Sequence, residues 1–251
     1  MTNVFSTFST RIPASLASDS LEVYLLGTVD FDAALFLQER LVYEISGRDD
    51  TQGALIVCEH PPVITVGRDG SRAHLRREPQ ELRALELDVR WLNRGGGCLV
   101  HGPGQLAVYP ILPLDRLGLG LAAYRRRLED SAIDAAGELH VAAECRSDVA
   151  GVWCRSGQFA FLGAAVQRWI SHHGMFINVS PSLRLMRLVD ATGRGERITS
   201  LAAARARPTA MHAVRESLVR NLACRLNYER VHVYTGHPLL ARTTRTAHVF
   251  A

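Results

Sequence analysis

The segment RGGGCLVHGPGQLAVYPIL (residues 94–112) carries seven glycine and proline residues among apolar side chains, and its second half has the pattern of a strand. Glycine loses more backbone entropy on folding than any other residue, so a glycine cluster marks a sharp turn or a close approach of the backbone to another group. A hairpin connection between two strands is one interpretation. The density of glycine, with the embedded Arg94 and His101, favours the other, a loop that lies against a ligand.

The size and composition of the chain predict a folded, soluble protein. It has 251 residues, of which 47% are apolar and 22% charged, enough for one large domain or a main domain with a small appendage. No segment approaches the roughly 18 consecutive apolar residues of a membrane span, and the N-terminus lacks the basic start and apolar stretch of a signal peptide. We therefore expect a flexible leader over residues 1–20, a catalytic domain over residues 21–232, a tail over residues 233–251, and a cytoplasmic location.

The basic residues are unusual in kind. All 29 residues counted as Lys and Arg are arginines, and the sequence contains no lysine. Arginine stays protonated at physiological pH, so it holds anions but serves neither as a base nor as an amine nucleophile. The net charge of +4 suits an acidic or phosphate-bearing partner. A nucleic-acid role ranks low, because the arginines are dispersed and not interleaved with aromatic residues.

The cysteines predict neither disulfides nor zinc. Their number is odd and no two stand in a CxxC pair, which argues against a disulfide framework and a zinc site. We expect reduced thiols, with Cys58 and Cys224 packed as small buried apolar residues. The five cysteines are Cys58, Cys98, Cys145, Cys154 and Cys224.

Hydrophobic periodicity predicts helices and strands along most of the chain. The expected helices span residues 31–46, 76–86, 121–139 and 208–227, and the expected strands span residues 21–27, 54–67, 87–93, 106–112, 149–154, 158–169 and 174–179, with the run 54–67 broken by Pro61 and Pro62. The apolar residues expected to share one face of a helix are Ala34, Leu37, Leu41 and Ile45 in the first, Leu121, Leu128, Ala132 and Ala135 in the third, and Val214, Leu218 and Leu222 in the last. Short turns join the last three strands, so we expect them to be antiparallel neighbours. No βαβ repeat is evident. The fold class is therefore α+β, a single domain with a mixed or antiparallel sheet flanked by helices.

Five motifs follow one another at characteristic separations. They are EHPPVITVGR (residues 59–68), the glycine segment (residues 94–112), GVWC (residues 151–154), FLGAAVQRWISHHGMFINV (residues 161–179) and ITSL (residues 198–201). In this order they resemble the lipoyl (octanoyl) transferases, which are relatives of the lipoate and biotin protein ligases. The resemblance spans nearly the whole chain and implies a biotin/lipoate protein ligase-like fold.

The resemblance also implies an activity and partners. Such transferases of lipoate biosynthesis move an octanoyl group from the phosphopantetheine arm of acyl carrier protein to a lysine of a lipoyl domain. Lipoyl domains occur in 2-oxoacid dehydrogenases, and the glycine cleavage H protein is a further acceptor. We expect no metal or other cofactor, and no nucleic-acid or membrane partner. ATP-dependent ligation ranks low, because the ligase relatives use a lysine that this chain lacks.

The family's substrate-binding stretch maps onto the glycine segment and two apolar walls. Glycines leave room for an acyl chain or pantetheine arm, and backbone N–H groups can bind a developing oxyanion. An apolar slot selects chain length, because each buried methylene contributes about 0.8 kcal/mol. For His101 and His173, a hydrogen-bonding role is favoured over a catalytic one, since no paired acid is visible. The implied substrate-binding residues are Arg94, Gly95, Gly96, Gly97, Cys98, Leu99, Val100, His101, Phe161, Leu162, Gly163, Gly174, Met175 and Phe176.

The catalytic pair of the family is replaced in this chain. Members carry a nucleophilic cysteine in a Pro-Cys-Gly turn and a lysine that favours the thiolate of this cysteine. An ungapped alignment of residues 172–201 places Thr192 at the cysteine position, and Gln158 stands at the lysine position. A threonine hydroxyl needs an activating base, and glutamine is not one.

Three interpretations remain open. The protein transfers the acyl group without the pair, by proximity and oxyanion stabilisation. Alternatively, Cys98 in the glycine loop or Cys154 supplies the thiol. In the third interpretation the protein is catalytically inactive and binds acyl carrier protein or lipoyl domains.

Overall fold

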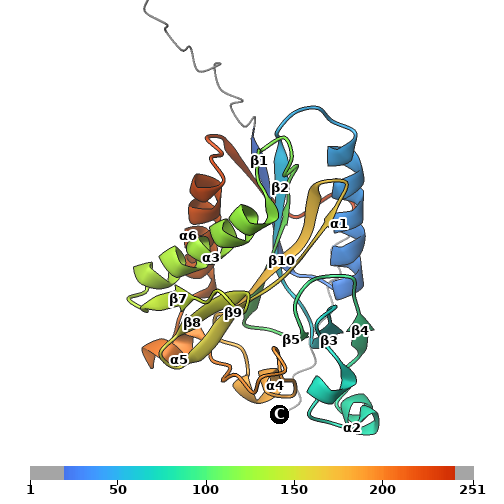
Figure 1. Cartoon of the computed structure of the whole chain (residues 1–251), viewed down its shortest axis with the longest axis vertical. Coiled ribbons are helices and arrows are strands. Elements are labelled where there is room, and N and C mark those ends of the chain that lie inside the picture. The colour runs from blue at the N-terminus through green and yellow to red at the C-terminus, as the bar shows by residue number, and fades with distance from the viewer. Residues whose placement is uncertain (1–19, 241–251) are drawn as a thin grey trace, which may run out of the picture.

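The structure is a computed structural model, and residues 20–240 of it are described (Figure 1). The helices are α1 (Phe31–Ser46), α2 (Pro79–Ala84), α3 (Leu121–Glu138), α4 (Leu183–Met186), α5 (Leu201–Arg205) and α6 (Met211–Arg225), with a 3-10 turn η1 (Arg72–His74). The strands are β1 (Leu21–Thr28), β2 (Gly53–Glu59), β3 (Val63–Val66), β4 (Val89–Trp91), β5 (Cys98–His101), β6 (Gln105–Ile111), β7 (Ala143–Cys145), β8 (Gly151–Cys154), β9 (Gly157–Gln167), β10 (Ile170–Asn178) and β11 (Val231–Thr235).

Two sheets form the framework. The larger has eight strands in the order β11-β1-β2-β6-β10-β9-β8-β7, and the smaller has the order β4-β3-β5. In the large sheet, β1 pairs in parallel with β2 and with β11, while the other neighbours are antiparallel. The predicted α+β class with a mixed sheet is confirmed, as is the antiparallel order of β8, β9 and β10. The unit β1-α1-β2 is parallel, and this βαβ connection was missed because periodicity does not reveal which strands pair.

The glycine segment connects the two sheets. Strand β5 pairs with β3 in the small sheet, and β6 lies between β2 and β10 in the large one. The turn between them needs a glycine at residue 104, where φ is +87° and an added Cβ would lie 2.6 Å from the carbonyl oxygen of Ser180. This segment therefore sets the position of one sheet relative to the other.

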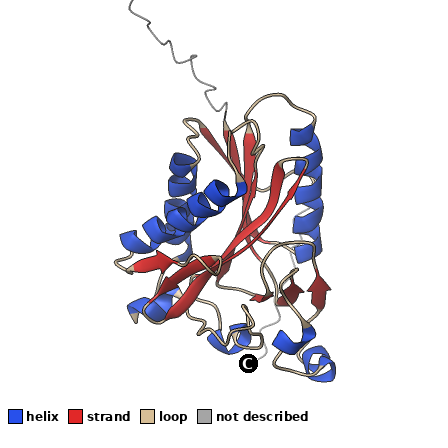
Figure 2. Cartoon of the chain, viewed as in Figure 1, coloured by secondary structure: helices blue, strands red, loops and turns tan. Residues whose placement is uncertain are grey.

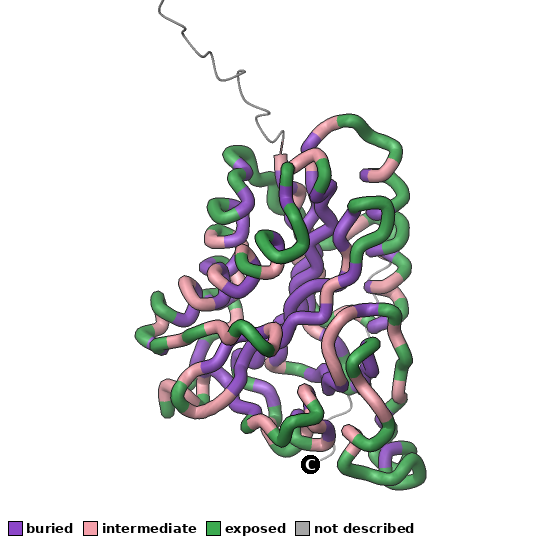
Figure 3. The backbone as a smooth tube through the Cα atoms, in the orientation of Figure 1, coloured by how far each residue is buried: buried purple, intermediate pink, exposed green. Residues whose placement is uncertain are grey.

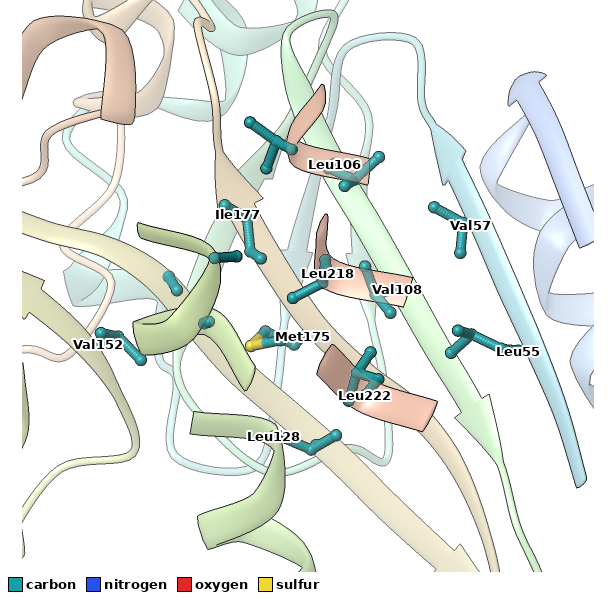
Figure 4. Packing of buried hydrophobic residues seen from close by; sticks show 14 of the residues in the cluster. Leu55, Val57, Leu106, Val108, Leu128, Val152, Met175, Ile177, Leu218 and Leu222 are labelled. Carbon is teal, nitrogen blue, oxygen red and sulfur yellow. The ribbon is translucent and has the colours of Figure 1, made fainter. Parts of the chain in front are cut away.

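Helices cover both faces of the large sheet (Figure 2). On one face, Leu128 of α3 and Leu218 and Leu222 of α6 pack against strand residues such as Val108 and Met175 (Figure 4). On the other face, α1 and the small sheet enclose a second apolar cluster. The central strands carry an almost continuous run of buried residues (Figure 3). Such a two-sided core explains why these strands appear in the sequence as apolar runs and not as alternating patterns.

The long helices follow the sequence pattern closely. The carboxylate of Asp30 accepts hydrogen bonds from the N–H groups of Asp32 and Ala33 and so caps α1. All four apolar positions predicted to share the inner face of this helix are buried, and so are the three of α6. They are Ala34, Leu37, Leu41 and Ile45 in α1, and Val214, Leu218 and Leu222 in α6.

Some expectations about single residues and boundaries were wrong. Leu121, predicted on the inner face of α3, is 57% exposed, because it lies in the first turn of the helix. Cys224 is exposed although a buried position was expected, whereas Cys58 is buried as expected. Strand β11 crosses the expected boundary at residue 232, so the sheet continues to Thr235. The leader over residues 1–19 and the tail after residue 240 lie outside the described residues.

Within residues 20–240, no helix is both long and apolar enough to cross a membrane.

Candidate active site

The glycine loop lies directly against the backbone of two other segments. The N–H of Gly95 donates to the carbonyl oxygen of Ala164 in β9 at 2.9 Å. An added Cβ at Gly96, where φ is +76°, would lie 2.7 Å from the carbonyl oxygen of Leu162. At Gly97 the same addition would overlap the carbonyl oxygen of Ala191. Glycine at these positions therefore lets segments of the protein pack closely against one another, in addition to any approach of a ligand.

The guanidinium of Arg94 donates hydrogen bonds to the backbone of this loop. Its side chain is fully buried, and its guanidinium donates to the carbonyl oxygens of Gly95 at 2.9 Å and Gly97 at 3.3 Å and to the hydroxyl of Thr65 at 2.7 Å. Burial lowers the pKa of Arg94 to about 10, so it remains a cation at neutral pH. Gly163 leaves space for it, since a Cβ there would lie 2.8 Å from Nη1. The cation is thus enclosed by protein and does not face solvent.

A cavity of about 250 Å³ opens beside the loop. It brings together the glycine loop, the start of β9 and the turn around residue 192, which are far apart in the sequence. A second, mainly apolar cavity of about 10 Å³ shares the lining residues Leu99, Phe161 and Ala191 with it. The main cavity is lined by Asp69, Gly96, Gly97, Leu99, Asp148, Val149, Ala150, Gln158, Phe161, Leu162, Ala191, Thr192 and Arg194.

Only part of the predicted substrate-binding set reaches this cavity. Gly96, Gly97, Leu99, Phe161 and Leu162 line it, and Val100 lines the smaller cavity. The remaining predicted residues line neither; they are Arg94, Gly95, Cys98, His101, Gly163, Gly174, Met175 and Phe176.

Two of these excluded residues were expected to form a wall of the groove. The side chain of Met175 packs in the core beneath α3 and α6, on the far side of the sheet (Figure 4). The ring of Phe176 packs against His101 and Tyr109. Alternation along β10 therefore sends both side chains into the protein interior, and the expected wall is wrong at these two residues.

Thr192 lies in a turn that Asp190 organises. The Asp190 carboxylate accepts hydrogen bonds from the N–H groups of Thr192 at 3.3 Å, Gly193 at 2.9 Å and Gly195 at 2.8 Å. The Thr192 hydroxyl oxygen in turn accepts from the N–H of Arg194 at 3.3 Å. Neither contact offers a base that removes the hydroxyl proton, so the geometry does not activate Thr192 as a nucleophile.

Gln158 is buried and lines the cavity. Its backbone N–H donates to the carbonyl oxygen of Arg197 at 2.8 Å, and its carbonyl oxygen accepts from the N–H of Thr199 at 2.9 Å. Its side-chain Nε2 donates to the carbonyl oxygen of Ala160 at 3.2 Å, which fixes the orientation of the carboxamide. The side-chain oxygen Oε1 has no hydrogen-bond partner among the described residues. The structure thus places Gln158 and Thr192 on one cavity with the glycine loop.

Comparison with known proteins assigns this chain to a family. The family model described as the lipoyl protein ligase A/B catalytic domain matches residues 30–223. The chain belongs to this family. An octanoyltransferase of Geobacter metallireducens is 36% identical over 214 residues, which cover 85% of this chain and 97% of that relative. An octanoyltransferase of Syntrophobacter fumaroxidans is 37% identical over 177 residues, which cover 70% of this chain and 77% of that relative.

Solved structures share the fold of this lipoyl protein ligase A/B domain. A bipartite lipoate protein ligase from Thermoplasma acidophilum aligns with a TM-score of 0.69 at 15% identity, over 86% of this chain and 88% of that chain. A lipoate-protein ligase A bound with ATP aligns with a TM-score of 0.65 at 12% identity, over 85% of this chain and 87% of that chain. The predicted membership and the predicted ligase-like fold are confirmed.

Sequence reasoning missed the charged residues around the cavity of this family member. Arg194 and Asp148 form an ion pair at 2.5 Å, and this hydrogen bond holds the pKa of the Asp148 carboxyl below its ordinary value. Asp69 accepts a hydrogen bond from the N–H of Gly96 at 2.9 Å. No local pattern marks these residues, because they meet only when three distant loops fold together.

The two candidate substitute thiols stand apart from the cavity. Cys98 is fully buried, its sulfur lies 3.5 Å from the carbonyl oxygen of Ser71, and burial raises its pKa above the ordinary value. The sulfur of Cys154 lies 3.2 Å from the hydroxyl of Ser156. Neither cysteine is among the lining residues, so neither is placed to receive an acyl group there.

The two histidines are buried and neutral. His101 lies between Thr65 and Gln105, with both ring nitrogens 2.8 Å from a partner oxygen, and burial lowers its pKa well below the ordinary value. Burial also lowers the pKa of His173 to about 3. Neither ring lines the cavity. The geometry therefore favours a hydrogen-bonding role for the ring of His101 and a packing role for the ring of His173, whose Nδ1 has no partner among the described residues.

Proposed function

We propose that this protein is an octanoyltransferase of lipoate biosynthesis and protein lipoylation. It takes an octanoyl group from the phosphopantetheine arm of acyl carrier protein and transfers it to a lysine of a lipoyl domain. Relatives named octanoyltransferase that are 36% and 37% identical support this activity. The observation that carries the proposal is the single cavity that gathers the glycine loop with Gln158 and Thr192.

The acyl chain would enter the apolar end of this cavity. Leu99 and Phe161 line both the main cavity and the smaller one behind it, so they stand along the path of an acyl tail. Burial of each methylene stabilises the complex by about 0.8 kcal/mol, which favours a chain that fills the space over a shorter one. The length of the slot then selects against longer chains.

We propose that transfer proceeds directly from the carrier to the acceptor. The family's route through an enzyme thioester needs a thiol and an activating amine, and neither is among the described residues that line the cavity. In direct transfer the lysine nitrogen bonds to the thioester carbonyl carbon. The carbon–sulfur bond breaks with its electron pair on sulfur, and the proton lost by the amine ends on the departing thiol. The protein contributes proximity and orientation, whose combined effect on rate is large.

The replaced pair also favours a second function. A family member without turnover would bind octanoylated carrier protein or lipoyl domains as a module. Purified protein incubated with octanoyl acyl carrier protein and a lipoyl domain distinguishes the two, by the mass of the lipoyl domain over time. Transfer faster than in the protein-free control supports the transferase. Stable binding of the carrier without such transfer supports the binding module and refutes the enzyme.

A further inference from the structure

The side-chain oxygen of Gln158, a residue that lines the cavity, is an acceptor without a partner. Gln158 is 1% exposed, and Oε1 has no partner among residues 20–240. Buried polar atoms are nearly always hydrogen-bonded, so an unpartnered one on a residue that lines a cavity indicates a missing donor. The expected donor comes from a ligand.

The carboxamide cannot turn to avoid this arrangement. Nε2 donates to the carbonyl oxygen of Ala160, and that acceptor would repel Oε1 if the group were flipped. Gly151 packs closely on the same side, since a Cβ there would overlap Nε2. Gly151 has a φ of +142°, a conformation that L side chains rarely adopt, so this position stays open to the glutamine. The protein therefore holds the acceptor oxygen in one orientation.

Neighbouring groups do not supply the missing donor. The hydroxyl of Thr192, on the same cavity, is not bonded to Oε1; its oxygen accepts from the N–H of Arg194, and the guanidinium of Arg194 is paired with Asp148. The enclosed cation of Arg94 donates to the loop carbonyls. The acceptor is left for a substrate.

Among the reacting groups, only one offers a donor at the reaction centre. The thioester carbonyl oxygen and sulfur are acceptors, whereas the attacking amine carries N–H bonds. We propose that Oε1 of Gln158 accepts a hydrogen bond from the acceptor lysine's amine and orients its lone pair toward the thioester carbonyl carbon. This inference rests on the proposed transferase function. Residue 158 then accepts a hydrogen bond, whereas the lysine ammonium that the family resemblance implies at this position would donate one.

In the bond-forming step the glutamine neither gains nor loses a proton. One N–H of the amine stays bonded to Oε1 and becomes the N–H of the product amide. The other proton leaves with the departing thiol, as in the direct transfer described above. Gln158 is then a substrate-contacting residue that binds the nucleophile and does not act as a base.

The test uses two probes that differ at one position. N-butyloctanamide carries the N–H of the product, and butyl octanoate replaces it with an ester oxygen that only accepts. We expect titration calorimetry of the wild-type chain to show tighter binding of the amide by roughly five- to tenfold, the scale of one net hydrogen bond. Gln158→Met removes the acceptor at similar volume and should abolish this preference. Gln167→Met, at an exposed position of the same strand, is the matched control and should keep it.

The possible outcomes distinguish a failure of this inference from a failure of the proposed function. Equal wild-type affinity for both probes overturns the role of Gln158 while leaving the acyl cavity intact. A preference that persists in Gln158→Met also overturns it, because another group then binds the N–H. Binding of neither probe refutes the acyl cavity and the proposed function with it. The wild-type comparison needs no variant to fold.

Discussion

Restoring the family's catalytic pair should convert this protein to the covalent route. The double variant Gln158→Lys with Thr192→Cys places an amine and a thiol at two positions that line the same cavity. A thiol with an ordinary pKa of about 8.5 is roughly 3% thiolate at pH 7. A nearby ammonium that lowers this pKa by about one unit raises the fraction to roughly 24%. The thiolate attacks the carrier thioester, and an octanoyl-enzyme accumulates.

The size of the effect follows from these fractions. Thr192→Cys alone should acylate, and the double variant should acylate roughly eightfold faster at pH 7, as the ratio of thiolate populations requires.

Intact-mass spectrometry after exposure to octanoyl acyl carrier protein measures the adduct. The wild-type protein is the control and should show none, because its thiols lie away from the cavity. A double variant that folds, binds the carrier and never acylates would refute the alignment of Gln158 and Thr192 with the catalytic pair. Equal rates for the single and double variants would refute the electrostatic coupling between the two positions.

Three further substitutions test the loop and its surroundings. Gly97→Ala makes a Cβ overlap the carbonyl oxygen of Ala191 and should lower the free energy of urea unfolding by about 1–3 kcal/mol, whereas Gly137→Ala, with open space around it in α3, should not lower it. Arg94→Ala removes the guanidinium hydrogen bonds to the Thr65 hydroxyl and to the carbonyl oxygens of Gly95 and Gly97, and should lower the same free energy by at least about 3 kcal/mol; a change below about 1 kcal/mol would show that the cation does not hold the loop. Cys98→Ser should leave octanoyl transfer to a lipoyl domain within about twofold, since the sulfur is buried away from the cavity, and loss of transfer would make Cys98 the nucleophile.

The main helices and several strands could be predicted because their signals are local. In α1 and α6 the apolar residues recur at the helical period, and burial follows that period. Pro61 and Pro62 mark the break between β2 and β3, because proline donates no backbone hydrogen bond. The predicted replacement of the catalytic pair also comes from the sequence, since it depends on residue identity at two aligned positions.

Pairing and side-chain direction needed the tertiary structure. Strand β11 pairs with β1, which lies near the other end of the described chain, and no feature of its own five residues indicates that partner. The sequence marked both Met175 and Phe176 as apolar, but only the sheet shows that one faces α3 and α6 and the other faces His101. The residues next to Arg94 in the sequence do not predict its burial, but in the folded protein its side chain is fully buried.

The same distinction between sequence and tertiary structure applies to the candidate site. Residue identities alone predict that a glycine loop, a glutamine and a threonine stand where the family has its reactive groups, and they show that no lysine amine is available. The folded chain was needed to show that Gln158 and Thr192 share one cavity, that Cys98 lies outside it, and that the glutamine oxygen has no partner among residues 20–240. This division arises because residue type and period are properties of neighbouring positions, whereas burial, pairing and hydrogen-bond satisfaction arise from contacts between segments far apart in the chain.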